Sequence, residues 1–87
     1  MGYKITFKSS VSKDLKKIDI KEVENILKKI EIELTNNATE YPCLTGKFAG
    51  LRKFRVGDYR IIYSIINKNT VLILRVAHRK EAYKNKF

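Results

Sequence analysis

The segment LRKFRVGDYRIIY, residues 51–63, decides the fold of this chain. Apolar and polar residues alternate on both sides of Gly57-Asp58, a two-residue connection with glycine first that is typical of a tight β-hairpin. A further turn is expected at Asn67-Lys68-Asn69. The segment therefore predicts an antiparallel meander whose three strands are residues 51–56, 59–66 and 70–77.

The residues before this segment predict one more strand and two helices. Tyr3, Ile5 and Phe7 alternate with polar residues, as in a strand with one buried face. Ser9 or Ser10 offers an N-cap for a short helix that ends near residue 17. Asp19 begins a longer helix that ends near Thr35, and its apolar stripe is Val23, Ile26, Leu27, Ile30 and Leu34.

The predicted fold is therefore α+β, in the order β-α-α-β-β-β. An N-terminal strand and a two-helix hairpin precede the three-stranded antiparallel meander, and residues 1–87 are expected to form a single domain.

Several functional classes are excluded by what the sequence lacks. No apolar run approaches the roughly 20 residues that span a bilayer, and residues 1–10 do not read as a signal peptide, so a cytoplasmic protein without membrane association is expected. One cysteine, Cys43, cannot form an internal disulfide. Cys43 and His78 alone carry no nucleophile motif and no metal-ligand set, so neither a metal nor a cofactor is expected.

Positive charge is concentrated in the second half of the chain. Residues 1–45 contain eight lysines and seven acidic residues, a net charge of +1, whereas residues 46–87 contain eleven basic and two acidic residues, a net charge of +9. All five arginines lie in this second half, at positions 52, 55, 60, 75 and 79. Because arginine suits bidentate phosphate recognition, a nucleic acid, an acidic protein, or both in turn are expected as partners.

Strand alternation predicts where the basic side chains point. Phe54 and Val56 belong to the face under the helices, so Lys53 and Arg55 are expected on the opposite face. Arg60 begins the next strand across the hairpin from Arg55. The same counting in the last strand sets Leu72, Leu74 and Val76 on one face and Val71, Ile73, Arg75, Ala77 and Arg79 on the other.

A cluster of Lys53, Arg55, Arg60 and Arg79 is therefore expected on one patch of the sheet. Like charges held 4 Å apart repel by about 1 kcal/mol per pair even in water, and only Asp58 and Glu81 supply carboxylates in this half. We interpret the cluster as a site for an anion, an RNA phosphate, rather than as a solubilising surface, which is the alternative reading.

The order of elements, the string LRKFRVGDYRIIYSI at residues 51–65 and the terminal AHRKEAY at residues 77–83 resemble the RelE/ParE superfamily of toxin-antitoxin toxins, on the RelE side. The resemblance covers essentially the whole chain, although only the second half is specific. It implies a ribosome-dependent endoribonuclease that enters the A site and cuts messenger RNA. It also implies a cognate acidic RelB-like antitoxin that wraps the toxin in a hetero-oligomer.

The resemblance further implies roles for individual residues. By position, the catalytic set is Lys53, Arg55, Arg60, Arg79 and Tyr83. The ribose 2′-OH would attack the adjacent phosphate and leave a 2′,3′-cyclic phosphate, while the cations stabilise the developing charge. Additional RNA contacts are expected from Lys47, Arg52, Arg75, His78, Lys80 and Lys84.

One departure from the family concerns the general base. The family has a lysine where this sequence has Arg55, and a guanidinium does not deprotonate in proteins. Lys53 is the better candidate, and His78 is the other titratable residue.

Two other functions fit the same residues. One is a ParE-like toxin that inhibits a topoisomerase by binding alone, and the other is a basic RNA-binding module without chemistry. Tyr83 favours the RelE reading, because ParE-like relatives generally lack the terminal tyrosine.

Overall fold

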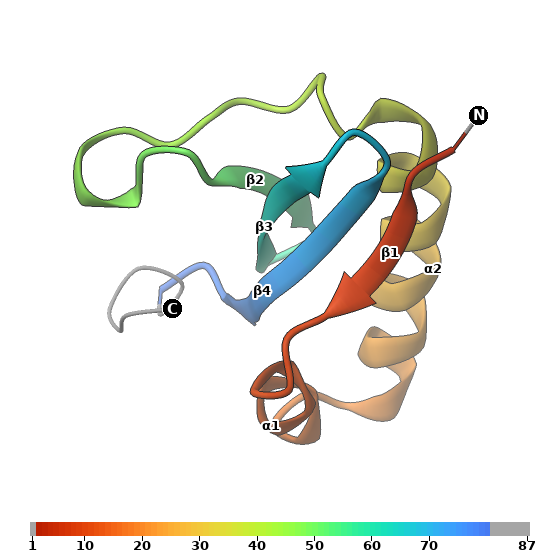
Figure 1. The fold of residues 1–87 in the computed structure, drawn as a ribbon. Helices are drawn as coiled ribbons and strands as arrows, with labels where there is room; N and C mark the ends of the chain where they lie inside the picture. Colours follow the sequence, from red (N-terminus) through yellow and green to blue (C-terminus); the bar gives the residue numbers. More distant parts are fainter. Residues whose placement is uncertain (1, 81–87) are drawn as a thin grey trace.

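The computed structural model describes residues 2–80 and shows the predicted α+β fold in the predicted order (Figure 1). The elements are β1 (Lys4–Phe7), α1 (Val11–Lys16), α2 (Ile20–Asn37), the short 3-10 helix η1 (Gly46–Phe48), β2 (Arg52–Val56), β3 (Tyr59–Asn67) and β4 (Thr70–His78). The predicted N-cap of α2 is confirmed, because the Asp19 side chain accepts a hydrogen bond from the backbone N–H of Lys21 at 3.4 Å.

The four strands form one sheet in the order β1-β4-β3-β2. The meander from β2 to β4 is antiparallel, and β1 joins the far side of β4 in parallel (Figure 1). Gly57 has a φ of 58°, the left-handed conformation that a tight hairpin turn requires at its first residue. The hairpin predicted from residues 51–63 is confirmed, with Arg55 paired to Arg60 across the turn.

Both helices pack on one face of this sheet and bury the core there. α1 contributes Val11, and α2 contributes Ile26, Ile30 and Leu34, the inner edge of its predicted stripe. The sheet contributes Phe54, Val56, Ile61, Tyr63, Val71, Ile73 and Val76. Each fully buried aliphatic side chain of this kind contributes roughly 1.5–3 kcal/mol relative to exposure, so the core fixes which face of the sheet is covered.

The last strand departs from simple alternation. Alternation set Val76 on the face opposite Val71 and Ile73, and this prediction was wrong, because all three belong to the helix-covered core. Ile62 pairs with Arg75 and Tyr63 pairs with Ile73, which leaves Leu74 without a partner in a β-bulge. The extra residue reverses the alternation, so the bulge turns Arg75 away from the helices.

The end of α2 is tied to the middle of the sheet by Tyr63. Its hydroxyl donates a buried hydrogen bond of 2.6 Å to the backbone carbonyl of Ala38, the C-cap residue of α2. Burial also raises the pKa of Tyr63 well above its ordinary value. The tyrosine thus satisfies a carbonyl that the helix itself leaves unpaired.

Replacing Tyr63 with phenylalanine should lower the free energy of unfolding by about 1–2 kcal/mol, because the carbonyl of Ala38 would remain buried without its donor. Chemical denaturation followed by circular dichroism measures the difference. Tyr3→Phe is the control, because the half-buried Tyr3 packs against the core and its hydroxyl makes no hydrogen bond within residues 2–80. Equal stability of the two variants would contradict the assignment.

Candidate functional site

The face of the sheet opposite the helices carries a row of cations. Arg55 pairs with Arg60, and Lys53 pairs with Ile62, which in turn pairs with Arg75. Paired residues point to the same side of a sheet, so these four cations share the face turned away from the core. We call Lys53, Arg55, Arg60 and Arg75 the basic face.

The floor of the basic face is apolar. Ile62 is 0% exposed although it lies outside the helix-covered core. Its cross-strand neighbours are Lys53 and Arg75, whose aliphatic stems can cover an apolar neighbour while the charged ends reach solvent. The arrangement holds charged groups close together above a packed, rigid surface.

Three of these cations border one pocket at the outer edge of β2. Lys53, Arg55 and Arg60 line it together with Phe54 and with two residues of the loop after α2, which are Tyr41 and Pro42. We call this cavity the basic pocket. The strand-pairing prediction that brought Lys53, Arg55 and Arg60 together is therefore confirmed.

Arg79 is anchored at the same end of the sheet. Its backbone N–H donates a 2.7 Å hydrogen bond to the carbonyl of Asp58 in the β2–β3 turn. At this end of the sheet, Tyr59 of β3 pairs with His78 of β4, and Arg60 pairs with Ala77. The exposed Arg79 comes directly after β4, so its backbone lies close to the start of β3, where Arg60 is. The backbone of Arg79 thus lies near the basic face, but Arg79 does not line the basic pocket, and its side-chain role stays a prediction.

The electrostatics of the basic face favour an anionic ligand. Asp58 is the only acidic residue between positions 46 and 80. In addition, the Nε atom of Arg75 is buried and has no hydrogen-bond partner among residues 2–80. A phosphate placed over the face would relieve the repulsion among the cations and supply several acceptor oxygens.

Arg52, expected as an RNA contact, lies on the other face of β2. It pairs with the core residue Tyr63, and its guanidinium donates hydrogen bonds to the carbonyls of Thr39 at 3.2 Å and Tyr41 at 2.7 Å. The side chain is committed to the loop after α2 and does not join Lys53 and Arg55.

His78 also lies apart from the basic face. Its ring meets Tyr59 edge-on, with centroids 5.7 Å apart, and its Nδ1 accepts a hydrogen bond from the backbone N–H of Lys80. Lys80 itself is exposed just beyond β4. Of the other predicted contacts, the side chain of Lys47 and the whole of Tyr83 and Lys84 lie outside the described residues.

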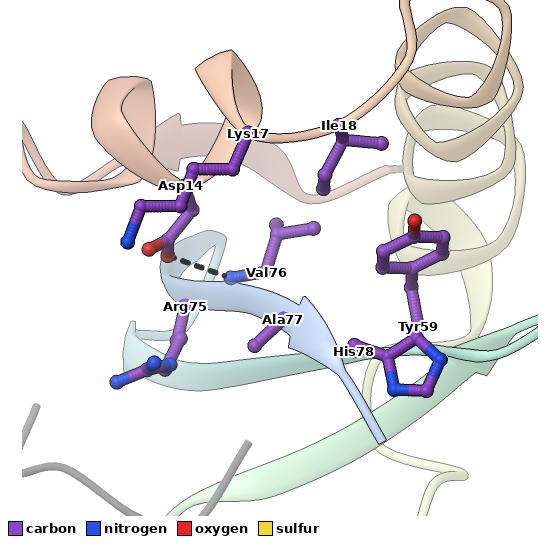
Figure 2. Close-up of a pocket in the computed structure, with 8 residues that line it drawn as sticks. All are labelled: Asp14, Lys17, Ile18, Tyr59, Arg75, Val76, Ala77 and His78. Atoms are coloured by element: carbon purple, nitrogen blue, oxygen red, sulfur yellow. Dashed lines mark hydrogen bonds between the residues drawn. The ribbon is translucent and has the colours of Figure 1, made fainter. Parts of the chain in front are cut away.

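A second, smaller pocket separates α1 from β4 and is shown in Figure 2. The carboxylate of Asp14, which lines this pocket, accepts a 3.1 Å hydrogen bond from the backbone N–H of Val76. β1 covers only Thr70 to Ile73 of β4, so Asp14 satisfies a donor on the uncovered part of that strand. Figure 2 also shows Val76 on the α1 side of the strand and Arg75 on the other, as the bulge requires.

Tyr41 is a site residue that sequence reasoning missed. Its ring packs against Phe54 with centroids 4.9 Å apart, and its hydroxyl donates a 2.8 Å hydrogen bond to the carboxylate of Glu33 on α2. Burial and the neighbouring Glu33 carboxylate raise the pKa of Tyr41 to about 12. The available signal was an aromatic residue directly before a proline in the loop between α2 and β2.

Residues 2–80 show neither a cluster of metal ligands nor a membrane-spanning helix. Over residues 2–80, no group of three or more histidine, cysteine, aspartate or glutamate side chains is arranged to hold a metal ion. None of the helices in the same range combines the length and apolar composition needed to cross a bilayer.

Comparison with known proteins points to one group. The family model of the ParE toxin of the type II toxin-antitoxin system parDE matches residues 5–83. The toxin-antitoxin complex RelBE2 from Mycobacterium tuberculosis contains a chain with 28% identity and a TM-score of 0.84, covering 91% of this chain and 100% of that chain.

Two further solved structures are similar. A mutant of the E. coli toxin RelE, in complex with an antitoxin RelB peptide, has 26% identity and a TM-score of 0.71 over 97% of this chain and 93% of that chain. The RelB-RelE complex from Methanococcus jannaschii gives 26% identity and a TM-score of 0.61, covering 91% and 95% respectively. No match was found among curated protein sequences.

The raised pKa of Tyr41 predicts a pH dependence of stability. Because the folded-state pKa is about 12 and the ordinary value is 10.0, the stabilisation is fully present below pH 10 and is lost as the pH rises through 12. Tyr41→Phe should therefore lose less stability than the wild type between pH 10 and 12. Denaturant unfolding at a series of pH values measures this, and parallel curves for the two proteins would exclude the Tyr41 contribution.

Proposed function

We propose a function from one premise: the chain belongs to the ParE toxin family of type II toxin-antitoxin systems, whose model matches residues 5–83. Toxins with this fold fall into two functional classes, endoribonucleases of the RelE type and ParE-like inhibitors that bind a topoisomerase. For this chain we propose the first, a ribosome-dependent endoribonuclease that cuts messenger RNA in the A site and so inhibits translation.

The observation that carries the proposal is the meeting of Lys53, Arg55 and Arg60 in one pocket, with Arg79 anchored to Asp58 at the same end of the sheet. Fixed cations around a phosphate stabilise the extra negative charge of a pentacovalent transition state, and this stabilisation is expected to contribute most of the rate enhancement in such a site. The likeness to RelE chains at 26–28% identity agrees with this choice.

In the proposed reaction the ribose 2′-oxygen forms a bond to the adjacent phosphorus while the bond from phosphorus to the 5′-oxygen breaks. The 2′-hydroxyl proton passes to a base, and the departing 5′-oxygen takes up a proton. The products are a 2′,3′-cyclic phosphate and a free 5′-hydroxyl. Among the described residues of the basic pocket, Lys53 is the cation that can act as a base in its neutral form, because guanidinium groups keep their protons.

A slow reaction on free RNA is expected from these residues. A lysine and several arginines can stabilise charge, but alignment of the 2′-oxygen with the departing oxygen must come from elsewhere. On the proposed function the ribosome supplies this alignment by holding the messenger RNA codon.

We further propose an acidic, RelB-like antitoxin as the neutralising partner in a toxin-antitoxin hetero-oligomer. The formal net charge of +10 and the basic face are complementary to an acidic chain. Similar RelE chains are found in complexes with antitoxins or an antitoxin peptide.

The second candidate is gyrase inhibition by binding alone, and one observation favours it: the matching family model is that of ParE. It predicts inhibition of DNA supercoiling in a gyrase assay and no cut RNA. The RNase reading predicts the reverse, so the two assays separate the classes.

Cleavage in a purified translation mixture is the central test. Wild-type toxin should cut a reporter transcript, and combining Lys53→Ala with Arg79→Ala should slow cleavage by at least about 100-fold, because a base and a charge-stabilising group are both removed. Primer extension maps and quantifies the cuts. Lys68→Ala, in the β3–β4 turn at the other end of the sheet, is the control and should cut like the wild type.

A transcript that stays intact with wild-type toxin would contradict the proposed endoribonuclease activity. A supercoiling assay on the same preparation would then test the gyrase alternative.

Antitoxin binding makes a separate prediction. Co-expression with the acidic antitoxin should restore growth that the toxin alone arrests, and the purified complex should weaken as salt rises, because charge pairing is screened. Growth curves and binding at two ionic strengths measure this. Growth arrest that no antitoxin relieves, or affinity independent of salt, would contradict the proposed interface.

A further inference from the structure

The basic pocket has two unlike walls. One consists of the cations Lys53, Arg55 and Arg60, and the other consists of Tyr41 and Pro42, with Phe54 in contact with the ring of Tyr41. A ligand that fits both walls has an anionic group attached to a flat or apolar body. A nucleotide has this form, because one ribose carries both the phosphate and the base.

The uncharged wall is accessible to a ligand. Pro42 is exposed and Tyr41 is half-buried, whereas Phe54 is only 6% exposed and serves as the support behind them. The ring of Tyr41 is held in place by its edge contact with Phe54 and by its hydrogen bond to Glu33. A proline ring and an aromatic ring fixed in this way can pack against any base, because every base presents a π-face.

The wall is also tied to the phosphate-binding residues through the backbone. The carbonyl of Pro42 accepts a 3.3 Å hydrogen bond from the N–H of Lys53. Next to it, Cys43 forms an isolated bridge with Arg52, and Leu44 donates to the carbonyl of Leu51. The position of the wall is therefore set relative to Lys53 itself.

Arg52 fixes the backbone at Tyr41, the first residue of this wall. Its guanidinium donates hydrogen bonds to the carbonyls of Thr39 and Tyr41, which both follow the end of α2. The last turn of α2 contains no basic residue, so Arg52 also supplies the positive charge that a helix C-terminus favours. Arg52 itself does not line the basic pocket.

We propose that Tyr41 and Pro42 form a nucleoside subsite, which receives the base next to the phosphate held by Lys53, Arg55 and Arg60, and that Arg52 is the positioning residue of this subsite. The inference rests on the proposed function, because it concerns the same RNA. It adds a specificity-determining wall that the cations alone do not provide.

The test compares two single-stranded RNA oligomers of equal length and charge, one normal and one without bases. Fluorescence anisotropy with purified toxin should give about tenfold tighter binding of the normal oligomer to the wild type, as expected for stacking of one base. Pro42→Gly removes the ring, and Arg52→Lys keeps the charge but loses the rigid fork. Both should reduce this ratio at least about threefold while binding of the abasic oligomer stays unchanged.

Lys68→Ala is the control and should keep the wild-type ratio, and cooperative thermal unfolding of each variant shows that it is folded. If Pro42→Gly leaves the ratio unchanged while both oligomers bind, the subsite is overturned and the phosphate site stands. If only Arg52→Lys leaves it unchanged, the positioning role of Arg52 is overturned. If neither oligomer binds the wild-type toxin, the phosphate site fails and the subsite fails with it.

Discussion

The β-bulge at Leu74 is the constraint on which the division of the sheet into two faces depends. Without it, Val76 would alternate away from Val71 and Ile73, and Arg75 would point into the helix-covered core. A buried, unpaired guanidinium costs several kcal/mol, and the core would also lose an aliphatic side chain. One unpaired residue thus lets the same strand pack against α1 and contribute a cation to the opposite face.

A second constraint links the helices to the functional edge of the sheet. Tyr63 and Arg52 are cross-strand partners on the core side, and both donate hydrogen bonds to backbone carbonyls at and after the end of α2. The chain leaving α2 is thereby directed along β2, where it reaches the basic pocket as Tyr41 and Pro42. The hydrogen bonds of Tyr63 and Arg52 therefore influence both the packing of α2 on the sheet and the shape of the proposed RNA site.

These two constraints also explain what the sequence could predict. The hairpin at Gly57-Asp58 and the helix after Asp19 depend on signals within a few residues, so both were predicted, and the grouping of Lys53, Arg55 and Arg60 followed from the hairpin register. The bulge depends on how β4 packs between β1 and β3, and no local residue type marks it. Arg52 looked like its basic neighbours, because its carbonyl partners become visible only when the loop after α2 is in place.

The basic pocket contains two arginines, which can bind an anion, and one lysine, which could also act as a base. This difference bears on the two functional classes of toxins with this fold. Arg55 and Arg60 can hold a phosphate at any physiological pH, but they cannot take a proton from a 2′-hydroxyl. On the proposed function that task falls to Lys53, which pairs with the apolar Ile62 and lines the basic pocket together with Arg55 and Arg60. On the same proposal, a scaffold without Lys53 would still bind anions through its arginines but would lack the base that RNA cleavage needs. On the proposed function, the charge of the sheet therefore accounts for anion binding, and the residue at position 53 decides whether bound RNA can be cut.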